Sequence, residues 1–164
     1  MARFALMAFA RAAARSLAMA AAAAACNLAA AAGTPFSVAP CDFKAPDQWG
    51  EYSVRWAGTC ANGKAEGLGV LRAYRDGQVQ QIYFGRFVQG EPSFGVIDHP
   101  EGFIAGRFKN GKLVDNEERQ DVISAFRAGE AAALAFAQQL KRNGNASSAR
   151  FYQEKAHKLA TQME

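Results

Sequence analysis

Few residues in this chain have the type and spacing that catalysis or metal binding requires. The two histidines lie far apart: His99 precedes a proline in a turn, and His157 stands in a lysine-flanked helical stretch. Isolated histidines of this kind are usually solvated surface residues, and no Cys-x-x-Cys or His-x-x-x-His pair indicates a zinc site. The chain also lacks a G-x-S-x-G elbow, a P-loop and a dinucleotide fingerprint. We therefore expect no catalytic residue, no cofactor and no metal.

Two polar clusters are better explained by secondary structure than by a binding site. Residues 63–69 are rich in glycine and include Lys64, as a phosphate cradle would, but their spacing fits hairpin turns and no helix follows. Acidic residues gather between positions 115 and 121. Acids in this arrangement are typical of a helix N-terminus, where they face the positive end of the helix dipole.

Residues 1–32 have the pattern of an export signal. Arg3, Arg11 and Arg15 precede an alanine-rich apolar run, and three alanines before Gly33 fit an A-x-A cleavage site. The run is too short for a spanning helix, and the alternative is an ordinary N-terminal helix. Without these three arginines, 16 of the 19 basic residues remain, and they almost balance the 15 acidic ones. The mature chain therefore attracts neither nucleic acid nor anionic lipid.

The three cysteines are consistent with export. An odd number of cysteines in a secreted chain needs an explanation, and two are open. Cys26 follows three alanines, as in a lipoprotein cleavage box that lacks the usual leucine, and would then carry a lipid anchor. Cleavage near Ala32 would instead remove Cys26. Both explanations leave Cys41 and Cys60 as an even pair in an oxidising compartment, either periplasmic, anchored to the outer membrane or secreted.

Residues 47–115 have the pattern of an antiparallel β-meander of about six strands. Aromatic and β-branched residues alternate with polar ones, and short turn sequences separate these runs. The turn sequences are Asn62-Gly63, Asp76-Gly77, Gln89-Gly90, Pro100-Glu101-Gly102 and Asn110-Gly111. Glycine suits these hairpins because their turns need positive φ angles. The preceding residues 33–46 contain prolines and small polar residues and are expected to form a tether.

After residue 115 the apolar period becomes helical. Asp115 is the expected N-cap of a first helix, Asn143-Gly144-Asn145 closes it, and a second helix is expected over residues 148–162. The apolar stripes comprise Val122, Phe126, Ala133, Ala137, Leu140, then Tyr152, Ala156, Leu159 and Met163. Residues 116–164 thus predict a helical hairpin. The expected fold class is α+β, with a β-meander of hairpins capped by a C-terminal α-helical hairpin.

A glycine frame recurs through the predicted meander. Its members are Gly58, Gly63, Gly67, Gly69, Gly85, Gly90, Gly106 and Gly111. The frame resembles the MORN repeat, with the best match from Trp56-Ala57-Gly58 to Asp76-Gly77 and two less complete units up to residue 115. The resemblance implies a twisted antiparallel sheet with one hairpin per unit and aromatic residues stacked along one face. In such a sheet a Cys41–Cys60 disulfide would tie the N-terminal segment to the first hairpin, the alternative being two free thiols.

The aromatic residues of the predicted sheet have two interpretations. They are Trp49, Tyr52, Trp56, Tyr83, Phe84, Phe87, Phe94, Phe103 and Phe108. The favoured interpretation is a core beneath the helices, because one side of every strand faces a core. The other is a groove for a peptide, glycan or partner helix, with Trp56, Tyr83 and Phe103 as binding aromatics.

These patterns together predict a non-enzymatic scaffold or protein-interaction module of the bacterial cell envelope. Its expected partner is another envelope protein, with membrane contact only through an N-terminal lipid anchor at Cys26. Two alternatives remain open. One is a membrane-surface module, since MORN-like sheets have been proposed to contact lipid. The other is an envelope enzyme or enzyme inhibitor with a cleft between sheet and helices.

Overall fold

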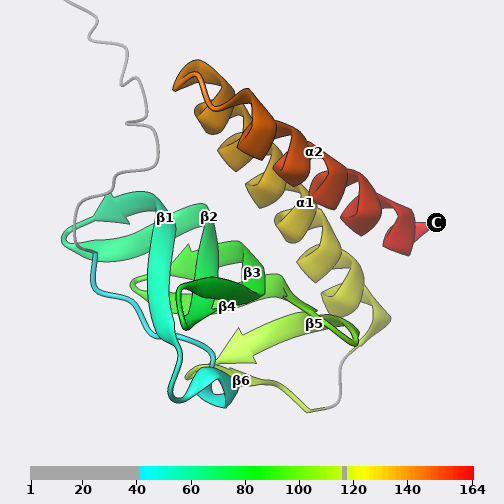
Figure 1. Cartoon of the computed structure of the whole chain (residues 1–164). Coiled ribbons are helices and arrows are strands. Elements are labelled where there is room, and N and C mark those ends of the chain that lie inside the picture. The colour runs from blue at the N-terminus through cyan, green and yellow to red at the C-terminus, as the bar shows by residue number, and fades with distance from the viewer. Residues whose placement is uncertain (1–40, 116–117) are drawn as a thin grey trace, which may run out of the picture. The chain divides into compact units, whose positions relative to one another are not determined.

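The computed structural model describes residues 41–115 and 118–164, which form a six-stranded antiparallel sheet followed by two helices (Figure 1). The predicted α+β class and the meander are confirmed, since the strands pair in sequence order from β1 to β6. Their bounds are β1 Ser53–Ala61, β2 Lys64–Arg75, β3 Gln78–Val88, β4 Glu91–His99, β5 Gly102–Lys109 and β6 Lys112–Leu113. The export signal, Cys26 and residues 33–40 of the tether lie outside the described residues.

The hairpin turns have the geometry that their sequences predict. Asn62 and Gly63 have φ angles of 52° and 76°, and the pairs beginning at Asp76, Gln89 and Asn110 are alike. Two successive positive φ angles define the type I′ turn, whose twist matches that of the flanking strands. Three of these turns join β1 to β2, β3 to β4 and β5 to β6, so the structure contains three successive hairpins.

Five glycines lie side by side across the sheet, one on each of the first five strands. This glycine row consists of Gly58, Gly69, Gly85, Gly95 and Gly106, which are paired in register from strand to strand. A Cβ on either of the first two would overlap the indole of Trp56, and a Cβ on Gly95 would overlap the phenol of Tyr83. A Cβ on Gly85 would overlap the backbone of Phe94 and Gly95 and the Tyr83 hydroxyl. The absence of side chains along the row therefore leaves space for the rings of Trp56 and Tyr83 against the backbone.

The sheet buries residues on both faces. The helix-covered face carries Ala57, Val70, Phe84, Val96 and Ala105, which form one cross-strand row. The opposite face carries the next row, Trp56, Leu71, Tyr83, Ile97 and Ile104. Because successive side chains of a strand point to opposite faces, the aromatic residues divide between two cores. The expectation of one aromatic core beneath the helices is corrected accordingly.

The second core is closed by the chain that leads into β1. Trp49, in the short 3-10 helix η1 (Asp47–Trp49), is buried there, and its indole nitrogen donates a 2.7 Å hydrogen bond to Gln81. Phe87 contacts Trp56 and Tyr83, with ring centroids 4.5 and 5.5 Å away. The large apolar side chains of this second core therefore cover a face that would be exposed to solvent if only the helices packed on the sheet.

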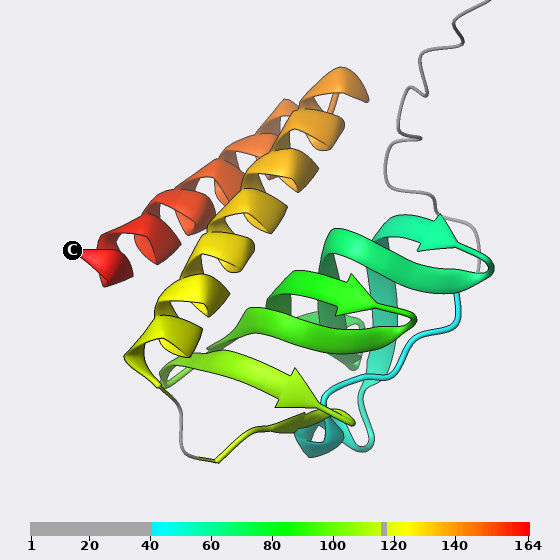
Figure 2. The same ribbon diagram turned by 180° about the vertical axis from the view of Figure 1, so that it is seen from behind.

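Residues 41–47 form a strap that crosses the ends of the three hairpins (Figure 2). The backbone N–H groups of Asp42, Lys44 and Asp47 donate to the carbonyl oxygens of Gly63, Gly90 and Gly111, over 2.8, 2.7 and 2.9 Å. One strap residue thus bonds to the closing glycine of each hairpin turn. This part of the predicted tether is held against the sheet along its length.

The two helices cover one face of the sheet (Figure 2). Helix α1 (Arg119–Arg142) packs on β2 to β5, and α2 (Ala146–Ala160) packs back along α1 and ends in the short helix η2 (Thr161–Met163). Gly144, with a φ of 77°, makes the turn between them, as predicted. No helix within residues 41–115 or 118–164 is both long enough and apolar enough to span a membrane.

The first helix begins later than expected. Its N-cap is Glu118, not Asp115, and the carbonyl of Glu118 accepts the N–H of Asp121 over 2.8 Å. The reason lies upstream, where β6 pairs with β5 and Val114 donates to Arg107, so the chain is still bound to the sheet at that point. The second helix begins two residues earlier than predicted, because Asn145 caps it by accepting the N–H of Ser148.

Candidate functional site

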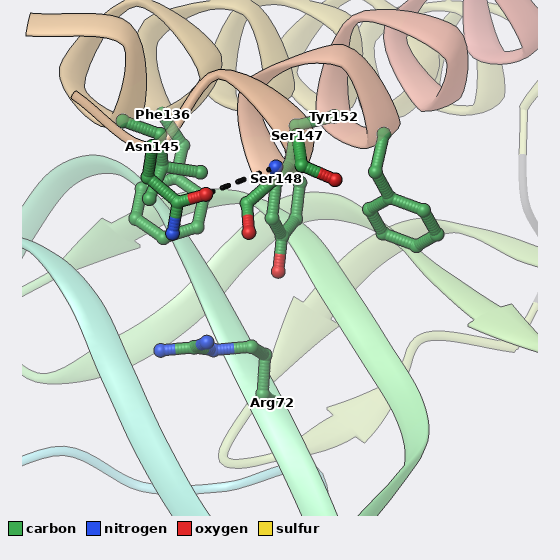
Figure 3. Close-up of a pocket in the computed structure, with 8 residues that line it drawn as sticks. Arg72, Phe136, Asn145, Ser147, Ser148 and Tyr152 are labelled. Atoms are coloured by element: carbon green, nitrogen blue, oxygen red, sulfur yellow. Dashed lines mark hydrogen bonds between the residues drawn. The ribbon is translucent and has the colours of Figure 1, made fainter.

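A cavity of about 310 Å³ lies between the sheet and the turn that joins α1 to α2 (Figure 3). Strand β2 contributes Arg72, and the last turns of α1 contribute Phe136 and Leu140. The capping residue and first turns of α2 contribute Asn145, Ser147, Ser148, Phe151 and Tyr152. One strand and two consecutive helices therefore supply one guanidinium, one amide, three hydroxyls and two phenyl rings.

Strand alternation directs Arg72 to the helix-covered face. Its neighbours Leu71 and Ala73 are buried in the opposite core, so the arginine between them must point toward the helices. Its guanidinium carbon lies 5.6 Å from the centre of the Phe136 ring and 5.8 Å from that of Tyr74. These distances are within the range of cation–π attraction, so two rings hold the charged group in place.

The charge of Arg72 is not balanced by the protein around it. Its Nε atom is buried and has no hydrogen-bond partner. No carboxylate among the described residues lies within ion-pair distance of this guanidinium. A buried donor without an acceptor costs about 1–3 kcal/mol, and more when the group is charged. An acceptor brought by a ligand would offset this cost.

Tyr152 places a neutral hydroxyl beside the arginine. Burial raises the pKa of Tyr152, and the nearby Arg72 guanidinium, which also hydrogen-bonds to it, only partly opposes the rise. The tyrosine is held by ring contacts with Phe84, Phe136 and Phe151, at centroid distances of 6.1, 4.6 and 5.1 Å. It therefore remains a phenol at neutral pH and can donate a hydrogen bond.

The chemistry of this lining favours binding over catalysis. None of the eight lining residues is a carboxylate, histidine, lysine or cysteine. The hydroxyls of Ser147, Ser148 and Tyr152 would need an adjacent base to become nucleophiles, and the lining residues include none of these usual bases. A single cation with hydroxyl donors and aromatic walls instead has the chemistry of a pocket for an anionic group.

The residues predicted as binding aromatics lie in other surroundings. Trp56 and Tyr83 are buried in the second core, on the sheet face away from the helices. Phe103 is half-buried on the helix-covered face and packs edge-on against Phe126, with centroids 6.0 Å apart. None of the three lines the cavity.

The predicted glycine frame serves two structural purposes. Gly58, Gly69, Gly85 and Gly106 belong to the glycine row in the strands. Gly63, Gly90 and Gly111 lie in the turns and accept hydrogen bonds from the strap. The eighth member, Gly67, lies beside an irregular pairing between β1 and β2 and has a φ of 76°.

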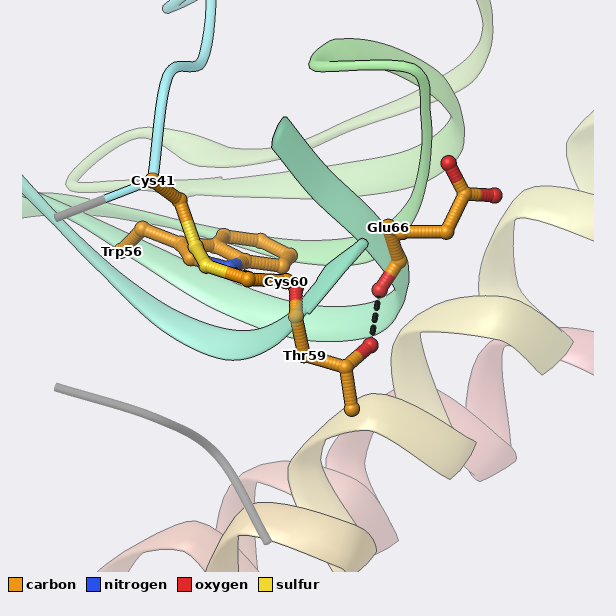
Figure 4. Close-up of a disulfide and its surroundings, with 5 residues drawn as sticks. All are labelled: Cys41, Trp56, Thr59, Cys60 and Glu66. Atoms are coloured by element: carbon orange, nitrogen blue, oxygen red, sulfur yellow. Dashed lines mark hydrogen bonds between the residues drawn. A yellow bond between two sulfur atoms is a disulfide. The ribbon is translucent and has the colours of Figure 1, made fainter. Parts of the chain in front are cut away.

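Cys41 and Cys60 form a disulfide that joins the strap to the end of β1 (Figure 4). Their Cα atoms are 5.9 Å apart, as expected for a cystine. Trp56 lies beside the bond, and its indole nitrogen donates to the carbonyl of Thr59 over 3.2 Å. The hydroxyl of Thr59 in turn donates to the carbonyl of Glu66 on β2. The structure thus places these two cysteines at disulfide distance, in agreement with the predicted pairing.

Arg72 was not among the residues predicted from the sequence, although its strand carries a signal. The run Val70-Leu71-Arg72-Ala73-Tyr74 places an arginine between residues that a two-faced sheet buries. A charged residue in such a strand is expensive to bury unless it has a partner. A charged residue at a core-facing position therefore indicates a functional role. The position can be recognised as core-facing only once both faces of the sheet are known to be covered.

Comparison of this chain with known proteins found no match among protein-family models, curated proteins or solved structures. The site is therefore interpreted from its own geometry.

Proposed function

We propose that this chain is a non-enzymatic protein-interaction module of the bacterial cell envelope, built on MORN-like hairpins. The observation that carries the proposal is the cavity at Arg72, which holds an unbalanced cation and hydrogen-bonding groups but no carboxylate, histidine, lysine or cysteine among its lining residues. A pocket of this composition can recognise an anionic group of a partner through the Arg72 charge and the surrounding hydrogen-bond donors.

The rest of the fold supports the cavity as a rigid base. The sheet is packed on both faces, the strap binds all three hairpin turns, and the disulfide fixes the start of the strap. A pre-organised surface loses little conformational entropy on association, so more of the contact energy appears as affinity. This arrangement suits a scaffold that presents one recognition site.

The two alternative functions have less support. A membrane-surface module would need an apolar or strongly basic patch, whereas the exposed large apolar residues Val79, Val88, Leu134 and Phe151 are spread over β3, α1 and α2. An enzyme or enzyme inhibitor would use a cleft between sheet and helices. The cavity does lie there, but its lining favours the binding roles.

Site-specific photo-crosslinking in the exported, full-length protein tests the proposal. A photoreactive residue would replace Phe151, which is 44% exposed at the rim of the cavity, or Val88, which is 46% exposed and does not line it. We expect a discrete protein adduct in envelope preparations from position 151 and none from position 88. Substitution Arg72→Gln should reduce the adduct.

Two outcomes would contradict the proposal. The first is the absence of any adduct at position 151 when the exported protein is folded and the photoreactive residue is active. The second is an adduct at position 88 alone, which would place the interface at the hairpin turns, where Val88 lies beside Gln89.

A further inference from the structure

We propose that the cavity binds the C-terminal carboxylate of a partner polypeptide, with Arg72 as the cation that pairs with it. The inference rests on the proposed function for the source of the carboxylate, because it assumes that the partner is a protein. It goes further by naming the chemical group that is recognised and the residue that recognises it.

The buried Nε atom of Arg72 needs a hydrogen-bond acceptor that the surrounding protein does not supply. A guanidinium presents its N–H donors in a planar fork that matches the two oxygens of a carboxylate. Arg72 Nε lacks any hydrogen-bond partner, and no described carboxylate pairs with this side chain. The rings of Phe136 and Tyr74 orient the guanidinium, and the Tyr152 hydroxyl hydrogen-bonds to it, but none of these groups brings a negative charge. A ligand carboxylate would supply both the charge and the acceptors.

The charge of the pocket indicates a monoanion. Arg72 is the only cation among the eight lining residues, so one negative charge balances it. A phosphate dianion would bring more charge than this lining can neutralise. Outside the cavity, Lys141, Arg142 and Arg150 are exposed near the same end of the helical hairpin. These cations would speed the approach of an anionic chain end without specifying its shape.

The remaining walls suit the last residue of a peptide. Phe136, Leu140 and Phe151 offer apolar surface for one side chain, while Asn145, Ser147 and Ser148 offer hydrogen bonds for a peptide backbone. The volume of about 310 Å³ is at the lower end of the range for ligand pockets and has room for one terminal residue. We therefore expect a large apolar residue at the C-terminus of the partner.

Binding of a short probe peptide to the full-length protein tests this assignment. The probe is N-acetyl-Ala-Ala-Phe with a free carboxylate, compared with the same peptide ending in an amide, and titrations are followed by calorimetry and by NMR. We expect binding of the acid and a loss of about tenfold or more in affinity for the amide. Arg72→Gln should cause a similar loss.

Arg75→Gln is the matched control. Arg75 lies on the same strand, is exposed and contacts Tyr52, but does not line the cavity, so its loss should leave the affinity unchanged. Should Arg72→Gln fail to fold, the comparison of acid and amide in the unmodified protein still decides the matter. NMR shifts at Ser147, Ser148 and Tyr152 on addition of the acid would locate the binding.

Three results would overturn the inference. They are equal affinity for acid and amide, tighter binding of inorganic phosphate than of the peptide, and binding of free N-acetylphenylalanine without binding of the peptide. Each is distinguishable from failure of the proposed function. An Arg72-dependent adduct at position 151 with no preference for a carboxylate would support the interaction module and contradict carboxylate recognition. Carboxylate binding without any adduct would support recognition of the carboxylate group and contradict the interaction module.

Discussion

Gly69 lies beneath the indole of Trp56, and Gly95 lies beneath the ring of Tyr83. At neither position is the φ angle in the left-handed region, so backbone freedom is not what requires glycine there. The requirement is space, because a side chain would occupy the volume that the ring fills. Single residues of the row thus decide whether the rings can lie against the sheet.

Gly69→Ala tests this space requirement. The added methyl group would meet the six-membered part of the Trp56 indole, and overpacking of this kind costs about 1–3 kcal/mol. Substitution Trp56→Phe removes part of that ring, so Gly69→Ala should cost less than about 1 kcal/mol in this background. Urea denaturation of the four proteins measures the coupling. Equal costs in both backgrounds would show that the indole does not restrict position 69.

Tyr83 makes the stability of the fold sensitive to alkaline pH. Burial raises the pKa of Tyr83, and the hydrogen bond with Ser93 only partly offsets the rise. The phenol regains its usual pKa on unfolding, so its contribution to stability is complete below pH about 10 and is lost as the pH rises above that value. The free energy of unfolding should therefore fall between pH about 9 and 11, and less steeply in Tyr83→Phe, by up to about 1.4 kcal/mol per pH unit.

The control for the pH prediction is Tyr52→Phe. Tyr52 is half-buried beside Arg75 and lies outside the Tyr83 contacts, so Tyr52→Phe is the matched loss of one tyrosine hydroxyl with which the slope of Tyr83→Phe is compared. Identical slopes in the unmodified protein and in Tyr83→Phe would mean that Tyr83 can ionise in the folded state.

Among the elements, the strap makes the three hairpins one unit. Its backbone bonds to Gly63, Gly90 and Gly111 link turns that are otherwise far apart along the chain. Gly111 shows why the closing residue is small, since a Cβ there would approach Lys44 Cε to 2.9 Å and the Ala45 carbonyl oxygen to 3.1 Å. The disulfide at Cys41 secures the strap at its beginning.

Removal of the disulfide should weaken the whole fold. Cys41 and Cys60 are 19 residues apart, and a loop of this length contributes about 3 kcal/mol in the chain-entropy model. The double substitution of both cysteines by alanine should lower the free energy of unfolding by about that amount in urea denaturation. Reduction of the unmodified protein is the control and should give a similar loss. A loss below about 1 kcal/mol in both would mean that backbone bonds alone hold the strap.

At the scale of the whole molecule, the proposed compartment and the disulfide can be tested in one measurement. If the chain is exported, its intact mass after expression in a bacterial host should lack the signal, with Gly33 or an acylated Cys26 as the first residue. The Cys41–Cys60 bond should lower that mass by about two daltons, which reduction restores. Retention of Met1 and of two free thiols would contradict the envelope assignment.

The hairpins and their turns could be predicted because their signals are local. Asn62-Gly63 and Asn110-Gly111 specify type I′ turns through the φ angles that only a few residue types adopt readily. The end of α1 at Asn143 and Gly144 was predictable for the same reason. The start of α1 was not, because Val114 is kept in the sheet by Arg107, 7 residues earlier in the chain and on another strand.

The amino-acid sequence by itself determined the order of strands and helices and the turns between them, and it left Cys41 and Cys60 as the pair available for a disulfide. These depend on short-range periodicity, on the conformations open to glycine and on the number of cysteines. Only the tertiary structure decided that the sheet is covered on both faces, that five glycines form one row and that Arg72 meets Tyr152 beneath the helical turn. The physical reason is that cross-strand register and helix docking bring into contact side chains that are far apart in the sequence. No local sequence pattern indicates such contacts.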